Sequence, residues 1–204
     1  MLTEKERREI IEELKMELQS INATKLPVAK CREGVEIPEY RFFGDAGMDV
    51  RSMEDVLIYP GETKVIPTGL VVAIPFGREI QIRPRSGLSC NTKIRVSNSP
   101  GTIDSGYRKE MGVIISNDSS KLFHTINTEL YGDLCREYKR EEYPIYDLNE
   151  ENNSDGVYHI KVGDRVAQIV LSKHEIIEFE ETELEIIKKL GRDRGGGFGH
   201  SGIK

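Results

Sequence analysis

The stretch EIQIR, residues 79–83, places isoleucine at every second position between charged and amide side chains. Alternate residues of a β-strand point to opposite faces, so this pattern predicts a strand with one apolar face. KIRVS at 93–97 and YHIKV at 158–162 alternate in the same way. Further short apolar or alternating runs lie at 70–74, 111–115, 165–171 and 175–180. Glycine and proline separate most of these runs, which predicts an all-β jelly roll, sandwich or barrel.

Residues 1–26 form an extension in which the period changes. No glycine or proline interrupts residues 3–19, where apolar side chains recur at helical spacing: Ile10, Ile11, Leu14 and Leu18. Thr3 and Glu6 have the spacing of a capping box, which satisfies the free N–H groups at a helix start. We therefore expect a helix that either packs on its own domain or binds a partner protein.

Residues 118–156 interrupt the strands of the main domain, which we place at 27–193. The segment is polar, and asparagine, aspartate and serine, which favour turns, crowd both of its flanks. Leu130, Leu134 and Tyr138 are spaced four apart, as in a short helix. The pattern indicates a partly helical insertion that is either a surface excursion or a partner site.

Composition excludes several classes of protein. The 204 residues carry a net charge of −6, and lysine and arginine are dispersed, which argues against a nucleic-acid-binding face. No apolar run approaches a membrane span, and the charged N-terminus does not resemble a signal peptide. Three widely spaced cysteines indicate reduced thiols and a cytoplasmic protein. The spacing of the four histidines matches no zinc motif.

The last eleven residues, RGGGFGHSGIK at 194–204, contain five glycines. Residues 197–202 match G-x-G-x-x-G, but that fingerprint must follow a strand and open a helix, and too little chain remains here. Glycines let main-chain N–H groups approach phosphate oxygens, and an aromatic side chain can stack on a base. The stretch is therefore either a disordered end or a lid over a phosphorylated ligand.

Four polar loops at strand ends could carry chemistry. RPRSGLS at 83–89 offers arginine forks and a serine hydroxyl, which suit a polyanion. NSPGTIDSGY at 98–107 is a tight loop in which Asp104 is either a turn residue or a general base. AGMDV at 46–50 and GDRVAQ at 163–168 complete the set.

These five stretches occur in the order AGMDV, RPRSGLS, NSPGTIDSGYRKE, GDRVAQIVL and RGGGFGHSG. Together they resemble the trimeric dUTPase family over residues 27–117 and 157–203. The resemblance implies a β jelly roll, which is a distorted β-barrel. It also implies a homotrimer whose three active sites are shared between subunits. It also implies hydrolysis of dUTP to dUMP and pyrophosphate, with Mg²⁺ bridging the phosphates mostly through water and without a protein ligand.

The resemblance also assigns the catalytic centre. Asp104 corresponds to the general base, which deprotonates the water that attacks the α-phosphorus. Arg85, Ser86 and Gly87 correspond to the phosphate cradle. Gln168 corresponds to a residue at the phosphate and water end, and Asp49 to a carboxylate that supports the centre.

Nucleoside recognition follows from the same resemblance. Asn98 and the backbone at Thr102, Ile103 and Gly112 correspond to the groups that read the uracil edge. Tyr107 corresponds to the residue that packs under the deoxyribose and leaves no room for a 2′-hydroxyl. The glycine-rich ending supplies the remaining substrate-binding residues, which are Arg194, Phe198, Gly199 and Ser201. Phe198 corresponds to the residue over the uracil, and Arg194 and Ser201 correspond to those at the γ-phosphate.

Two positions depart from the family pattern. Lys109 stands where the family usually has glycine, and Arg194 lies one residue closer to Phe198 than usual, so Arg192 is an alternative γ-phosphate ligand. The insertion and the N-terminal helix are additions to the minimal family chain. They leave open a second function, a nucleotide-gated regulatory scaffold that binds a repressor-like protein.

Overall fold

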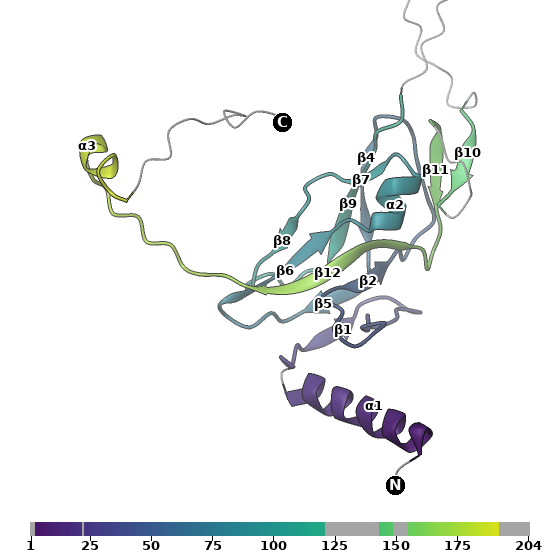
Figure 1. Ribbon diagram of the computed structural model, residues 1–204. Helices are drawn as coiled ribbons and strands as arrows, with labels where there is room; N and C mark the ends of the chain where they lie inside the picture. Colours follow the sequence, from purple (N-terminus) through teal and green to yellow (C-terminus); the bar gives the residue numbers. More distant parts are fainter. Residues whose placement is uncertain (1–2, 22, 121–142, 149–154, 192–204) are drawn as a thin grey trace, which may run out of the picture. The chain divides into compact units, whose positions relative to one another are not determined.

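The computed structural model describes residues 3–21, 23–120, 143–148 and 155–191 (Figure 1). Strands dominate this part of the chain, as the alternating sequence predicts. The strands are β1 (Val28–Lys30), β2 (Met48–Arg51), β3 (Val56–Ile58), β4 (Thr63–Pro67), β5 (Leu70–Val72), β6 (Arg78–Arg83), β7 (Ile94–Val96), β8 (Gly101–Ile103), β9 (Gly112–Asn117), β10 (Ile145–Asp147), β11 (Val157–Ile160) and β12 (Arg165–Lys173). The helices are α1 (Glu4–Ile21), α2 (Ser86–Asn91) and α3 (Leu184–Ile187).

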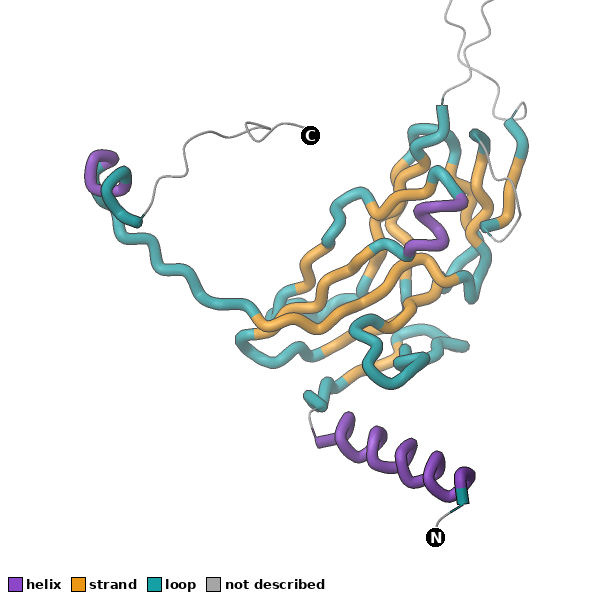
Figure 2. Tube along the Cα trace, in the orientation of Figure 1, coloured by secondary structure: helices purple, strands orange, loops and turns teal. Residues whose placement is uncertain are grey.

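The strands form four small sheets, in the orders β1-β5, β10-β11-β3, β2-β12-β6-β8 and β4-β9-β7. Every pairing between the described strands is antiparallel except that of β10 with β11. Strands that are distant in sequence lie side by side, and the long strand β12 crosses the middle of its sheet (Figure 2). This arrangement agrees with the predicted jelly roll.

The core is made by one face of each strand. Ile80 and Ile82 of the EIQIR stretch are buried, as the alternation predicts. Isoleucine, valine and leucine side chains from the other strands complete this core, together with Met111 and Tyr158. Fully burying one such side chain stabilises the fold by roughly 1.5–3 kcal/mol, so the alternating pattern determines which face of each strand turns inward.

The chain divides into two compact units, residues 1–174 and 175–204. The first contains α1 and all twelve described strands, and the second contains α3. The predicted capping box is present in α1, because the Thr3 N–H donates to Glu6 Oε2 at 2.7 Å and the Glu6 N–H donates to Thr3 Oγ1 at 3.3 Å. No helix of the described residues is long and apolar enough to cross a membrane.

Several segments differ from the sequence expectation, and one is the stretch 83–89, whose last four residues begin helix α2 rather than a loop. Residues 175–180 do not form a strand, since a strand requires a ladder partner and none of the described residues supplies one. The insertion contains β10, which the sequence does not predict, and Tyr146 of this strand packs against the core. The helix expected around Leu130, Leu134 and Tyr138 lies outside the described residues.

Candidate active site

Three neighbouring strands bring a carboxylate, an amide and an arginine loop together. The β2–β12 register pairs Asp49 with Gln168, and the β12–β6 register pairs Gln168 with Arg83. Arg85 follows the end of β6 by two residues and immediately precedes α2. Asp49 therefore meets Arg85, 36 positions away in the sequence, and Gln168, 119 positions away, at one end of the sheet. The hydrogen-bond register of the strands fixes these neighbours.

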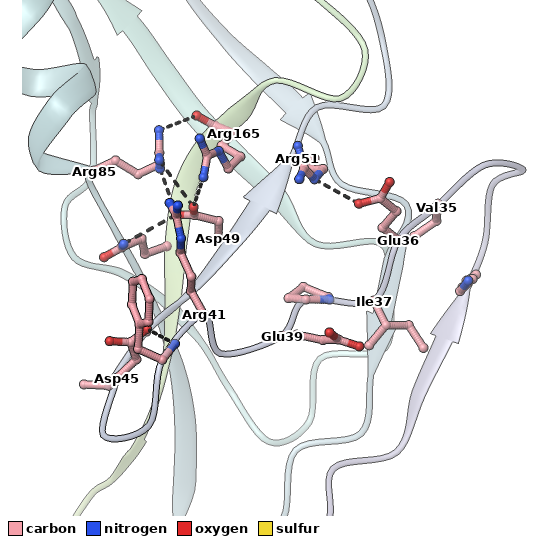
Figure 3. Close-up of a pocket in the computed structure, with 16 residues that line it drawn as sticks. Val35, Glu36, Ile37, Glu39, Arg41, Asp45, Asp49, Arg51, Arg85 and Arg165 are labelled. Atoms are coloured by element: carbon pink, nitrogen blue, oxygen red, sulfur yellow. Dashed lines mark hydrogen bonds and ion pairs between the residues drawn. The ribbon is translucent and has the colours of Figure 1, made fainter. Parts of the chain in front are cut away.

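The centre of this group is an ion pair between Asp49 and Arg85 (Figure 3). Arg85 Nε lies 2.8 Å from Asp49 Oδ1, and Arg85 Nη2 lies 3.3 Å from Oδ2, which is the forked geometry of a bidentate pair. Arg165 Nη1 lies 3.3 Å from Asp49 Oδ2, and Gln168 Nε2 lies 3.4 Å from Oδ1. Asp49 thus holds two guanidinium groups in place at the end of the sheet.

The protonation of Asp49 follows from these contacts. Partial burial by itself raises the pKa of the Asp49 carboxyl, but the hydrogen bond and charge of Arg85, with smaller contributions from Gln168 and Arg165, outweigh it and hold the pKa below its usual value. The carboxylate therefore stays ionised at neutral pH. Its chemistry suits the orientation of arginines rather than the uptake of a proton.

A large cavity of about 1030 Å³ opens beside this cluster and contains Asp49, Arg85, Arg165 and Gln168 in its lining. The loop before β2 forms another wall. The lining carries five cationic side chains: Lys30, Arg41, Arg51, Arg85 and Arg165. Four acidic side chains accompany them: Glu36, Glu39, Asp45 and Asp49. Arginines that neighbouring carboxylates hold in fixed positions are suited to bind a phosphate group.

Ser86 and Gly87 form the first turn of α2, directly after Arg85. Both are exposed, while Leu88 of the same helix is buried and anchors it to the core. The structure thus brings the three expected cradle residues together at the surface, beside Asp49 and Gln168.

The second group of expected residues lies on β8 and the loop that follows it. β8 pairs with β6 and is the last strand of its sheet within the described chain. Ile103 is buried and Thr102 is exposed, and Asn98 lies against Gly101, where an added Cβ would stand 3.1 Å from Asn98 Nδ2. One edge of the β8 backbone therefore lies next to a polar amide, which suits the reading of a ligand's polar edge.

A tight turn follows β8 and contains Asp104 and Tyr107. The Tyr107 N–H donates to the Asp104 oxygen at 3.0 Å, and the Tyr107 hydroxyl donates to the main-chain oxygen of Glu110 at 2.8 Å. Asp104 is exposed, and its carboxylate forms no ion pair with any described residue. Gly112 pairs with Pro67, and an added Cβ would lie 2.5 Å from Val65 Cγ1, so this position has no room for a side chain.

The lining of the cavity includes no residue of the Asn98–Gly112 segment. The expected residues Arg194, Phe198, Gly199 and Ser201 lie outside the described residues, as does Arg192. Lys109 is exposed. The sequence did not assign Arg165 to the site, although its place three residues before Gln168 in GDRVAQ was a usable signal.

The fold and these two groups define a strand-rich protein in which a carboxylate fixes two arginines beside a cavity, an arrangement whose chemistry suits a phosphorylated ligand. The family model "dUTPase" matches residues 33–129. A deoxyuridine 5′-triphosphate nucleotidohydrolase of Nautilia profundicola is 39% identical over 178 residues, which cover 87% of this chain and 99% of that relative. The chain belongs to the dUTPase family.

Solved structures of phage proteins share the fold. The Staphylococcus bacteriophage 80alpha dUTPase with dUpNHpp superposes with a TM-score of 0.69 at 28% identity, covering 89% of this chain and all of that chain (100%). A mutant dUTPase from phage phi11 of S. aureus, described with a structural Mg(II) ion, has a TM-score of 0.62 at 28% identity, covering 79% of this chain and 99% of that one.

Proposed function

We propose that this protein hydrolyses dUTP to dUMP and pyrophosphate. The single observation that carries the proposal is the Asp49–Arg85 pair, which fixes an arginine fork beside Ser86 and Gly87 at the end of the sheet. Membership of the dUTPase family and the names of its bacterial relatives support the choice of substrate. An arginine already held by a carboxylate needs little reordering when the triphosphate arrives, so it can stabilise charge as the phosphate reacts.

Asp104 is the proposed general base. Its exposed carboxylate has no ion-pair partner in the described chain, so it is free to accept a proton from water, unlike that of Asp49. In the mechanism, this water attacks the α-phosphorus and the α–β bridging oxygen leaves with pyrophosphate. Gln168, whose amide nitrogen lies near Asp49, is proposed to contribute to the phosphate and water end of the site.

Mg²⁺ is the proposed cofactor. Within the described residues, no group of three or more histidine, cysteine, aspartate or glutamate side chains could hold a metal ion. A cation at this site would take its oxygens from phosphates and water, as Mg²⁺ commonly does. When bound, the ion neutralises charge on the phosphates. The chain's own contribution is to hold those phosphates through Arg85 and the cradle.

Nucleoside selection is assigned to β8 and its loop. Asn98 and the backbone at Thr102, Ile103 and Gly112 are proposed to pair with the polar edge of uracil, since β8 has a free edge within the described chain. A site built to pair with one polar edge rejects ligands that leave its groups unpaired. The Tyr107 ring is proposed to lie under the deoxyribose.

The complete site is proposed to form in a homotrimer. Membership of the dUTPase family supports this assembly, because the family resemblance implies active sites shared between subunits. The glycine-rich ending, with Arg194, Phe198, Gly199 and Ser201, is proposed to close over a neighbour's nucleotide. A lid that closes on substrate excludes water from the reaction.

Pyrophosphate release from dUTP tests the proposal, with dTTP, dCTP and UTP as controls. We expect rapid release from dUTP in the presence of Mg²⁺ and little from the other three nucleotides. Equal release from dUTP and dTTP would contradict the assignment of uracil selection to β8. No release from dUTP would contradict the proposed activity itself.

A second function, regulation through a protein partner, is favoured by one comparison. The description of the 80alpha structure states that phage dUTPases control transfer of virulence genes by a G protein-like mechanism. In this chain the insertion begins and ends on buried hydrogen bonds, since Asn117 Nδ2 donates to the Ile58 oxygen at 2.8 Å and the Gly156 oxygen at 2.7 Å. An insertion anchored in this way could present a surface to a partner protein without disturbing the candidate active site.

Removal of residues 121–142 tests this second function, because it leaves β10 and the Asn117 contacts in place. We expect dUTP hydrolysis to persist and capture of a repressor-like DNA-binding protein to be lost. Capture that survives the deletion would move the partner site to α1 or elsewhere.

A further inference from the structure

A bidentate ion pair connects the end of β1 to the loop that carries Tyr107. Arg32 Nε lies 2.7 Å from Glu110 Oε1, and Arg32 Nη2 lies 2.9 Å from Oε2, although the two residues are 78 positions apart. Their side chains are 41% and 25% exposed. A pair this exposed contributes little to global stability, so its value lies in the geometry that it fixes.

Glu110 ties a third segment to the same point. The Gly69 N–H donates to Glu110 Oε1 at 2.7 Å, and the Cys31 N–H donates to the Gly69 oxygen at 2.8 Å. Hydrogen bonds thus connect the segment Cys31–Arg32, the turn at Gly69 and Glu110 to one another. The hydrogen bond of Arg32 is the main cause that lowers the pKa of Glu110, so the carboxylate is ionised at neutral pH.

The main chain of the same glutamate holds Tyr107. The Tyr107 hydroxyl donates to the Glu110 oxygen at 2.8 Å, and the Tyr107 N–H closes the turn on Asp104. The side chain of Tyr107 is 38% exposed, and its hydroxyl contact ties the ring to the Glu110 backbone. The position of the ring therefore depends on where the Glu110 backbone stands.

We propose that Arg32 and Glu110 are positioning residues for sugar selection: the pair holds the Glu110 backbone, which holds the Tyr107 ring where a 2′-hydroxyl would collide with it. The inference rests on the proposed function, which places the deoxyribose on Tyr107. Arg32 and the Glu110 side chain need not touch the nucleotide. Loss of the pair lets the ring shift, and the site then admits ribose.

The test uses Arg32→Ala and Glu110→Gln in the full-length protein. Glutamine keeps an acceptor for the Gly69 N–H but cannot form the ion pair. Lys64→Ala is the matched control, because the Lys64–Glu62 pair has similar exposure, 38% and 28%, and does not contact the Tyr107 turn. The readout is the ratio of kcat/KM for dUTP to that for UTP, which a partly unfolded sample leaves unchanged.

We expect the ratio to fall about tenfold in both variants and in the double variant, since shifts of ~1 Å in a positioned group change rates by up to ~10²-fold. Arg32→Lys should recover part of the ratio, and Lys64→Ala should match the wild type. A ratio within about twofold of the wild type in both Arg32→Ala and Glu110→Gln would overturn the proposal.

Hydrogen exchange of the nucleotide-free protein separates this proposal from the proposed function. We expect amides of residues 104–112 to exchange faster in Arg32→Ala and Glu110→Gln than in Lys64→Ala. Unchanged exchange there would overturn the positioning role, whatever the activity. A wild-type chain that does not hydrolyse dUTP would instead remove the sugar assignment, while the exchange rates still decide whether the pair holds the turn.

Discussion

At the scale of single residues, the two aspartates of the site have opposite surroundings. Asp49 is held by two arginines, whereas Asp104 is exposed and forms no ion pair with the described residues. We expect Asp104→Asn to lower kcat for dUTP by at least ~10²–10⁴-fold, because it removes the proton acceptor, while nucleotide binding persists. Pyrophosphate release and calorimetric titration measure the two effects. Asp118→Asn, at an exposed aspartate outside the site, is the control, and full activity of Asp104→Asn would contradict the assignment.

Asp49→Asn should act through Arg85 and through stability. We expect a loss of roughly 1–3 kcal/mol in unfolding free energy at neutral pH, because the partly buried arginines lose their carboxylate. The pKa of Asp49 is lowered in the folded state, so its contribution is present above the usual aspartate pKa of about 3.9 and is lost as the pH falls through the lowered value. Urea unfolding at several pH values measures this.

The difference in unfolding free energy between wild type and Asp49→Asn should therefore narrow only in strong acid. A difference that is constant from neutral pH to well below the usual aspartate pKa would show that the charge of Asp49 is not what stabilises the cluster. The kinetic counterpart is a raised KM for dUTP, since the Arg85 fork is no longer oriented.

At the scale of elements, local pattern predicts strands better than it predicts their partners. The alternation of EIQIR identified β6 and its buried face, because burial of one face is a local property of the sequence. Residues 175–180 also carry apolar side chains between charged ones but form no strand, because pairing depends on a partner that local sequence does not reveal. The sequence did not predict the strand β10, because its three paired residues are too few to show an alternating pattern.

The same limit applies to the candidate site, where the sequence predicts residues better than it predicts their contacts. The order of the motifs predicts roles for Asp49, Arg85, Asp104 and Gln168, but the contacts of Asp49 with Arg85 and Gln168 depend on strand register. Glu110 ends the stretch NSPGTIDSGYRKE, but Arg32 belongs to none of the five stretches, so the sequence does not indicate that the two residues pair. Only the folded structure reveals such a contact.

The junction of the insertion with the main domain gives a prediction for one element. An added Cβ at Gly156 would lie 2.5 Å from the main-chain oxygen of Pro144, so β10 cannot keep its place beside β11. We expect Gly156→Ala to destabilise the protein by about 1–3 kcal/mol and to speed hydrogen exchange over residues 143–160. Exchange in β4 and β9 should stay near the wild-type rate. Uniform acceleration across all sheets would indicate a global effect instead.

At the scale of the whole molecule, exposed apolar side chains point to assembly. Ile176, Ile177 and Phe179 are 71%, 73% and 91% exposed in the single chain. Clustered apolar surface of this kind typically marks a protein interface. It supports the proposed homotrimer.

Subunit mixing tests whether one site uses more than one chain. Asp104→Asn and a deletion of residues 194–204 should each be inactive as pure trimers. If Asp104 and the glycine-rich ending of one site come from different chains, refolding both variants together at equal amounts should restore about a quarter of the sites, because each contribution is intact in half of the chains. Pyrophosphate release measures the recovery, and light scattering confirms the trimer. Activity no higher than that of the two parents would mean that each chain closes its own site.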